Sequence, residues 1–161
     1  MIYIEQDFLS RNDLMYIENL IYNFVPEQEP KRDYKNYYRN DYFKQQVPLT
    51  DTILTKINQT IKKYTDKDIV VKTIWLNKID VNSNQDDDFH RDGTHMSFVI
   101  YPFDDFVGGE LELRTETLPI QKNIAYIMLH NIEHRVKKVT EGVRWSIAVF
   151  CDYDNKNKNI I

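Results

Sequence analysis

The spacing of apolar residues predicts two amphipathic helices in the first 66 residues. After a candidate short strand at residues 1–5, Ser10 precedes an apolar stripe at helical spacing, which is typical of a helix N-cap. Thr50 and Asp51 open the second candidate helix in the same way. Both helices are expected to bury one face and to serve as scaffold. The stripes consist of Leu14, Ile17, Ile21 and Phe24, with Pro26 ending the first helix, and of Ile53, Leu54, Ile57 and Ile61.

From residue 69 the pattern changes to short β-rich runs separated by turn signals. The runs are IVVKTIWLN, MSFVIY, GGELEL, NIAYIML, EHRVKKV and VRWSIAVF. Because no helical pattern lies between them, they predict antiparallel pairing in a sandwich or barrel, and a jelly roll fits their number. The predicted class is mainly β with N-terminal helices. We expect one domain over residues 1–161, divided into a helical scaffold with a possible lid (1–66), a β core (69–151) and a polar tail (152–161).

Composition narrows the class of protein. A chain of 161 residues is expected to form one domain, and its formal net charge of −4 excludes global basicity as the attraction to nucleic acid or to an anionic membrane. A single cysteine, Cys151, excludes an internal disulfide framework and a thiolate metal site. The N-terminus has no apolar run of signal-peptide or membrane-spanning length. These features lead us to expect a cytoplasmic protein with no membrane attachment.

Residues 31–44, KRDYKNYYRNDYFK, form a local exception to the acidic balance. They contain five basic side chains, two acids and five aromatics. Such a segment suits a lid or groove for an anionic or extended partner, such as a peptide or a nucleic acid, because stacking and cation contacts serve both. The alternative is a tyrosine-rich surface loop in a tyrosine-rich protein.

The histidines and glycines are confined to the second half of the chain. None of either occurs in the first 89 residues, so metal or proton chemistry is expected between residues 90 and 134. Glycine is scarce, and each one is expected to mark a backbone position that tolerates little else, such as a strand junction. These residues are His90, His95, His130 and His134, and Gly93, Gly108, Gly109 and Gly142.

His90 and Asp92 are separated by one residue, so they project from the same face of an extended segment. An imidazole and a carboxylate placed in this way need one distant histidine to complete the two-histidine, one-carboxylate arrangement that holds Fe(II). His134 and His130 are both candidates for the third ligand. His95, just across Gly93, is too local and is expected to be a hydrogen-bonded strand residue or a contact to the ligands or the substrate.

The run VRWSIAVF alternates between two faces. Val143, Trp145, Ile147 and Val149 share one face with Cys151, whereas Arg144 and Ser146 lie on the other. If the second face lines an interior, the Arg144 guanidinium is buried at a cost of several kcal/mol unless an anion pairs with it. A carboxylate is the expected partner, because it matches the planar fork of arginine, and the Ser146 hydroxyl adds a hydrogen bond.

The motifs of residues 74–150 occur together in one known family. They are His90-Arg91-Asp92, Gly108-Gly109-Glu110-Leu111, Pro119 with Asn123-Ile124-Ala125-Tyr126, His134-Arg135-Val136, Val139, Gly142, and Arg144 with Ser146. This pattern resembles the Fe(II)/2-oxoglutarate-dependent oxygenases, especially the prolyl-4-hydroxylase-like branch. The resemblance implies a double-stranded β-helix, a jelly roll of the cupin-like kind.

The resemblance also implies roles for individual residues. The distal histidine of the family precedes the basic cosubstrate-binding residue by about ten positions, and this register selects His134 over His130 as the metal ligand beside His90 and Asp92. Arg144 and Ser146 would bind the far carboxylate of 2-oxoglutarate, with Tyr101 or Tyr126 supplying a phenol. The implied cofactors are Fe(II), 2-oxoglutarate and O2, with ascorbate as a stimulant.

Two positions depart from the family pattern. Collagen-type members generally carry lysine where this chain has Arg144, and Asn77 and Lys78 stand near the place where members often carry a tyrosine. The presence of Asp92 favours oxygen insertion, since halogenating relatives lack this carboxylate.

Three functions follow from these observations. The first is hydroxylation of a C–H bond in a peptidyl, prolyl-type residue or a small amino-acid-like substrate, with succinate and CO2 as co-products. The second is a nucleic-acid-directed oxygenase of the same chemistry, suggested by residues 31–44. The third is a jelly-roll binding module without catalysis. His130 is expected to be a loop or strand-end histidine, and the acidic run at residues 86–88 is expected to be a solvated loop.

Overall fold

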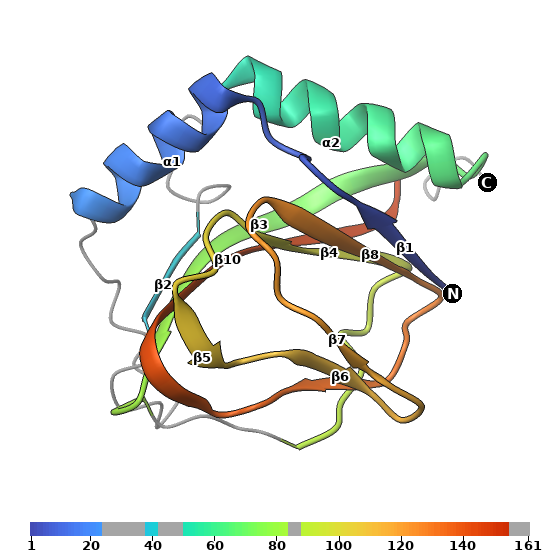
Figure 1. The fold of residues 1–161 in the computed structure, drawn as a ribbon. Helices are drawn as coiled ribbons and strands as arrows, with labels where there is room; N and C mark the ends of the chain where they lie inside the picture. Colours follow the sequence, from blue (N-terminus) through green and yellow to red (C-terminus); the bar gives the residue numbers. More distant parts are fainter. Residues whose placement is uncertain (24–37, 42–49, 84–87, 155–161) are drawn as a thin grey trace.

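The computed structural model describes residues 1–23, 38–41, 50–83 and 88–154, which fold into two helices and ten strands (Figure 1). The predicted lid over residues 31–44 lies outside the described residues, apart from the backbone of β2. The elements are β1 (Ile2–Glu5), α1 (Arg11–Tyr22), β2 (Tyr38–Asp41), α2 (Asp51–Tyr64), β3 (Ile69–Asp80), β4 (Met96–Tyr101), β5 (Phe106–Gly108), β6 (Leu111–Leu113), β7 (Thr117–Leu118), β8 (Ile124–Leu129), β9 (His134–Val136) and β10 (Val139–Tyr153).

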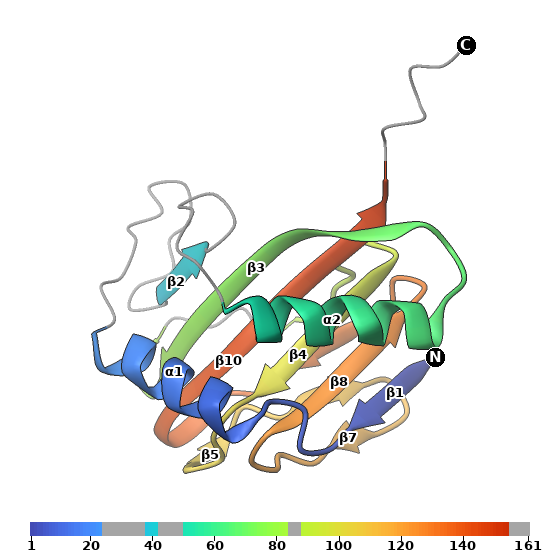
Figure 2. The same ribbon diagram turned by 90° about the horizontal axis from the view of Figure 1, so that it is seen from above.

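The strands form two sheets. The larger sheet has the order β1-β8-β4-β10-β3-β2, with β5 also paired to β10, and the smaller sheet has the order β7-β6-β9. All of these pairs are antiparallel, as the sequence predicts. Helices α1 and α2 lie across one face of the larger sheet, and the smaller sheet lies on the opposite side (Figures 1 and 2).

Both helices begin where the sequence predicts. The Ser10 side chain accepts a hydrogen bond from the Asp13 amide at 3.1 Å, and Thr50 accepts one from the Ile53 amide at 3.3 Å. Ile17 is buried in the stripe of α1, and Ile53, Ile57 and Ile61 are buried in the stripe of α2. Helix α1 ends at Tyr22 with Asn23 as its C-cap, and the predicted stripe and stop residues Phe24 and Pro26 lie outside the described residues.

The larger sheet buries both of its faces, and each face has its own core. Side chains at alternate positions of β3, β4, β8 and β10 pack against the helices, among them Leu76, Phe98, Ile127 and Val149. The intervening positions point toward the smaller sheet. A second apolar cluster fills this interior: Tyr101, Leu111, Leu118, Ile124, Tyr126 and Met128.

Strand β10 carries the predicted alternation. Arg144 lies opposite Ile79 and Ser146 lies opposite Asn77 in the pairing with β3, so these side chains share the interior face. The strand continues to Tyr153, and the first two residues of the predicted tail therefore belong to the sheet. Cys151 is buried in the helix-side core, and this burial raises the pKa of its thiol to about 12.

Neither described helix combines the length and the apolar character needed to cross a bilayer.

Asn123, just before β8, fixes the N-terminal segment to the sheet. Its Oδ1 accepts a hydrogen bond from the Leu9 amide and its Nδ2 donates one to the Leu9 carbonyl, both at 2.8 Å. Its backbone φ is +61°, a left-handed conformation that asparagine tolerates better than most residues. Asn123 is 6% exposed, so the bonded groups of Leu9 would lose their partners without access to bulk water.

We expect Asn123→Gly to lower the free energy of unfolding by about 2–4 kcal/mol, because glycine keeps the left-handed backbone but removes both side-chain hydrogen bonds. Urea unfolding measures this change. Asp7→Gly is the matched control, since Asp7 also has a positive φ of +50° but is exposed. Equal stability of the two variants would show that the Asn123 amide is not a structural clamp.

Candidate active site

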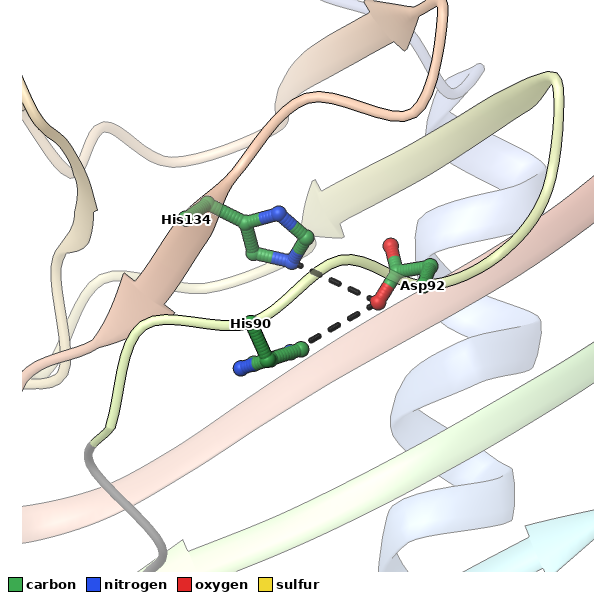
Figure 3. A group of neighbouring side chains, drawn as sticks. All are labelled: His90, Asp92 and His134. Atoms are coloured by element: carbon green, nitrogen blue, oxygen red, sulfur yellow. Dashed lines mark ion pairs between the residues drawn. The ribbon is translucent and has the colours of Figure 1, made fainter.

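His90, Asp92 and His134 converge on one point (Figure 3). One ligand atom from each residue lies within 4.8 Å of the others. Asp92 Oδ1 is 3.6 Å from His90 Nε2 and 3.5 Å from His134 Nε2. The side chain of His134 is 6% exposed, that of Asp92 14% and that of His90 48%, so the group opens to solvent on the His90 side.

Backbone pairing holds the two histidines together. His90 and His134 form an isolated antiparallel bridge, in which each amide donates to the carbonyl of the other at 2.8 and 2.9 Å. His134 is the first residue of β9 and lies opposite Leu113 of β6, whose side chain packs against the interior core. His134 therefore faces the interior between the sheets, whereas His90 stands at its edge.

Hydrogen bonds to the Nδ1 atoms set the tautomer of both rings. His134 Nδ1 contacts the Ile132 carbonyl at 2.8 Å, and His90 Nδ1 contacts the Asp88 carbonyl at 3.0 Å. A carbonyl oxygen only accepts, so Nδ1 carries a hydrogen and Nε2 is the ring atom that faces Asp92. Metal-binding histidines are commonly oriented in this way.

The charge and spacing of this group fit a divalent cation. Burial favours the neutral carboxyl, but hydrogen bonds donated by His134 and His90, together with their positive charge, outweigh it and hold the pKa of Asp92 well below its usual range. The site therefore presents an anionic oxygen, and a cation that displaced the protons between it and the rings would meet two nitrogen lone pairs. Ligands about 2.1 Å from one ion lie roughly 3.0–3.5 Å apart, which is close to the observed separations. Two nitrogens and one carboxylate suit Fe(II) with positions left open.

Arg144 is a buried cation without a carboxylate partner among the described residues. The residue is 3% exposed, and its guanidinium makes three hydrogen bonds to neutral groups: Nε to the Gly109 carbonyl at 2.9 Å, Nη1 to Ser146 Oγ at 2.8 Å, and Nη2 to the Tyr101 hydroxyl at 3.0 Å. A guanidinium has five N–H donors, so these contacts leave two unused. An anion that reaches this point would complete both the charge and the hydrogen bonding.

Gly109 leaves the room that Arg144 needs. A Cβ atom at this position would lie 2.6 Å from Arg144 Cδ, and the backbone φ is +72°. Gly109 is one of only four glycines in the sequence, and the close approach of Arg144 explains why a side chain is not tolerated there.

Asn77 was noted in the sequence only as a departure from the family pattern. It is 6% exposed, it lies opposite Ser146, and its Oδ1 has no hydrogen-bond partner. No hydrogen bond of its side-chain amide is found among the described residues. A buried amide oxygen in this state is costly, so it requires a hydrogen-bond donor in the same interior, such as a water molecule or a bound ligand. Rotation of the amide by 180° would present its N–H2 donors instead of the oxygen.

The two tyrosines proposed from the sequence differ in their contacts. Tyr101, at the end of β4, is fully buried and contacts Arg144. Tyr126, on β8, is also fully buried, but its hydroxyl donates to the Pro119 carbonyl. Burial, with Tyr101 and Glu116, raises the pKa of Tyr126 to about 12.

His130 and His95 lie together, outside the group formed by His90, Asp92 and His134, here called the metal group. Their ring centroids are 5.0 Å apart in an edge-to-face arrangement, and the His130 amide donates to the His95 carbonyl at 2.8 Å. Nε2 of His95 is buried without a partner. Among the described residues, only His90, Asp92 and His134 form a group that could hold a metal ion.

No family model matches the sequence, and no curated protein matches it. Solved structures do match. An oxidoreductase of the 2OG-Fe(II) oxygenase family from Burkholderia pseudomallei is 16% identical and has a TM-score of 0.69, covering 96% of this chain and 85% of its own. A prolyl-4-hydroxylase from Pseudomonas putida is 13% identical with a TM-score of 0.71 and coverage of 95% and 92%. HygX from Streptomyces hygroscopicus, solved with nickel, 2-oxoglutarate and hygromycin B, is 8% identical with a TM-score of 0.69 and coverage of 94% and 82%.

This chain therefore has the fold of the 2-oxoglutarate- and Fe(II)-dependent oxygenases. Prolyl 4-hydroxylases are among the structures that share it.

We expect His134→Ala to lose at least 100-fold in affinity for a divalent ion, because it removes one of three ligands, and His130→Ala to retain the wild-type affinity. Titration with Co(II) under anaerobic conditions, followed by visible absorption, measures both. The reverse result would mean that His130 completes the site instead of His134.

Proposed function

We propose that this chain is a single-domain Fe(II)- and 2-oxoglutarate-dependent dioxygenase built on a double-stranded β-helix. The proposed reaction hydroxylates a C–H bond of a peptidyl, prolyl-type residue or of a small amino-acid-like substrate. One molecule each of 2-oxoglutarate, O2 and substrate would be converted to succinate, CO2 and the hydroxylated substrate. The observation that carries this proposal is the pairing of a two-histidine, one-carboxylate group with a buried guanidinium that lacks an anion.

His90, Asp92 and His134 would hold the iron, which together with O2 supplies the oxidising power of the reaction. The histidines are presented through Nε2, because their Nδ1 atoms are bonded to backbone carbonyls. The half-exposed ring of His90 leaves the substrate a route to the group from solvent, whereas buried His134 faces the interior. Two histidines and one carboxylate would leave coordination positions open for the cosubstrate and O2.

Arg144 would bind the distal carboxylate of 2-oxoglutarate through its unused N–H groups. Ser146 and Tyr101 orient the guanidinium and would add hydroxyl contacts to the same carboxylate. Of the two tyrosines, Tyr101 would make the polar contact, because its hydroxyl accepts from Arg144 and donates only a long bond of 3.3 Å to the Gly109 carbonyl, whereas the Tyr126 hydroxyl donates to the Pro119 carbonyl. Tyr126 would contribute its ring to the interior wall.

Asn77 would supply a further polar contact to the cosubstrate. It faces the same interior as Ser146 and lacks a partner. In this role it replaces the tyrosine that family members often carry near this position.

Anaerobic addition of Fe(II) and 2-oxoglutarate tests the function. A weak visible charge-transfer band and substrate-independent succinate formation in air are expected from an oxygenase. Binding of both ligands without succinate would identify a non-catalytic module on this fold, and absence of the band would refute the cosubstrate assignment.

We expect Arg144→Ala to raise the dissociation constant for 2-oxoglutarate roughly 10- to 100-fold, since it removes a charge-assisted contact that is worth about 1.5–3 kcal/mol. The charge-transfer titration measures this change, and the affinity for Co(II) alone should stay constant. Arg11→Ala, on the exposed first turn of α1, is the control. A 2-oxoglutarate affinity equal to that of the control would exclude Arg144 as the anion-binding residue.

We expect Asn77→Leu to have opposite effects on stability and on binding. Removing a buried amide that lacks a partner should raise the free energy of unfolding of the cosubstrate-free protein by about 1 kcal/mol, while weakening 2-oxoglutarate binding several-fold. Thermal unfolding with and without cosubstrate measures both effects. Asn58→Leu, on the exposed face of α2, is the control. A less stable variant with unchanged 2-oxoglutarate affinity would show that the Asn77 amide has a structural role instead.

A further inference from the structure

The segment that carries two of the three proposed metal ligands is anchored at every second residue. His90 and Asp92 belong to the metal group, whereas the residues between and beside them contact other parts of the protein: Phe89, Arg91 and Gly93. Extended backbone alternates its side chains between two faces, so one face presents ligands and the other is available for anchoring. The position of Asp92 therefore depends on what holds its two neighbours.

Asn131 holds both neighbours of Asp92. Its backbone carbonyl accepts a hydrogen bond from Arg91 Nη1 at 2.6 Å, and its side-chain Oδ1 accepts one from the Gly93 amide at 2.7 Å. Asn131 is in the loop between β8 and β9, three residues before His134. One residue thus ties the Asp92 segment to the strand that carries the third ligand.

The backbone at Asn131 is in an uncommon conformation. His130 and Asn131 are consecutive residues with positive φ, +67° and +56°. Two left-handed residues in succession are unfavourable outside glycine, and such a conformation persists only where surrounding contacts enforce it. Here the turn brings Oδ1 of Asn131 to the amide of Gly93, whose own φ is +79°.

A second anchor acts on the other end of the segment. The guanidinium of Arg114 lies 3.9 Å from the centre of the Phe89 ring, and that of Arg135 lies 4.6 Å from it. Glu133 binds Arg114 at 2.6 Å and approaches Arg91 at 3.7 Å. These contacts hold Phe89, next to His90, but none of them reaches Gly93. On the far side of Asp92 the first anchor is the bond between Asn131 and the Gly93 amide, and the next is the bond between the His95 carbonyl and the His130 amide.

We propose that Asn131 is a positioning residue for the metal site, which fixes Asp92 by binding the backbone and side chain of the residues on either side of it. This inference rests on the proposed function, because it assumes that His90, Asp92 and His134 hold a metal. Asn131 does not itself touch the metal group. Its role is to keep the Asp92 carboxylate in the geometry that binds the ion, in the way that outer contacts orient ligands at other metal sites.

Asn131→Gly tests this role, because glycine keeps the left-handed backbone and the carbonyl that binds Arg91 but removes Oδ1. Anaerobic Co(II) titration should give a dissociation constant about tenfold or more above that of the wild type, with an altered visible spectrum. Asn131→Asp retains an acceptor for the Gly93 amide and should bind Co(II) no more weakly than the wild type. Equal losses in both variants would overturn the proposal, because the loss would not depend on the acceptor.

Asn123→Gly is the matched control for this experiment. Asn123, like Asn131, has a positive φ and an Oδ1 that accepts from a backbone amide. The amide in this case belongs to Leu9 in the N-terminal segment. This variant should lower stability without changing the Co(II) affinity of the folded protein. If Asn131→Gly does not fold, Arg91→Met removes the other hydrogen bond to Asn131 and should weaken Co(II) binding a few-fold; unchanged binding would then overturn the proposal.

The outcomes separate this inference from the proposed function. A wild-type protein that binds no Co(II) would contradict the metal site itself. A wild type that binds Co(II), together with an Asn131→Gly variant that binds it equally well, would contradict only the positioning role of Asn131.

Discussion

Arg144 places a positive charge between two sheets, and no carboxylate of the described residues is paired with it. Removing a guanidinium from water costs several kcal/mol, and its three hydrogen bonds to neutral oxygens recover only part of that cost. The surrounding structure is arranged around this charge. Gly109 has no side chain because a Cβ would collide with Arg144, Ser146 and Tyr101 turn their hydroxyls to it, and Asn77 faces the same interior with an unsatisfied amide. The chain thus retains an unfavourable polar interior that a dicarboxylate would make favourable.

This interior exists because the larger sheet is covered in two different ways. On one face, the apolar stripes of α1 and α2 bury aliphatic side chains of alternate strand positions, which stabilises the fold without polar groups. The other face meets a sheet of only three short strands, and here the alternate positions carry arginine, serine, asparagine and tyrosine beside the apolar cluster. The polar groups of the candidate site therefore lie on one face of the strands, and the helix-side core lies on the other. A register shift of one residue in β10 would move Arg144 and Ser146 to the helix side.

Sequence periodicity predicted most of this arrangement, because the signals are local. The caps at Ser10 and Thr50, the helix stripes and the two faces of β10 each depend on residues a few positions apart, and the structure has them as predicted wherever it describes the residues concerned. The choice of His134 over His130 came from a family resemblance, because residue chemistry alone makes both histidines equally suitable as the third ligand. The contacts of Asn131 with Arg91 and Gly93 had no sequence signal. They join polar groups about forty residues apart through a loop conformation that no periodic pattern encodes.

Asparagine performs at two loops the conformational role that glycine usually has, and it adds a hydrogen bond that glycine cannot make. All four glycines have positive φ, yet the loops on either side of β8 reach this conformation with Asn123 and Asn131. Glycine would adopt the backbone at lower strain, but it would increase the conformational entropy of the unfolded chain and leave the partner amides unbound. The partners differ in kind. Asn123 binds Leu9 at the border of the helix-side core, and Asn131 binds the segment that presents Asp92. Strand β8 is therefore fixed at one end to the element that stabilises the fold and at the other to the element that forms the metal group. The geometry of the site is in this way tied to the rigid part of the protein and does not depend on the loops alone.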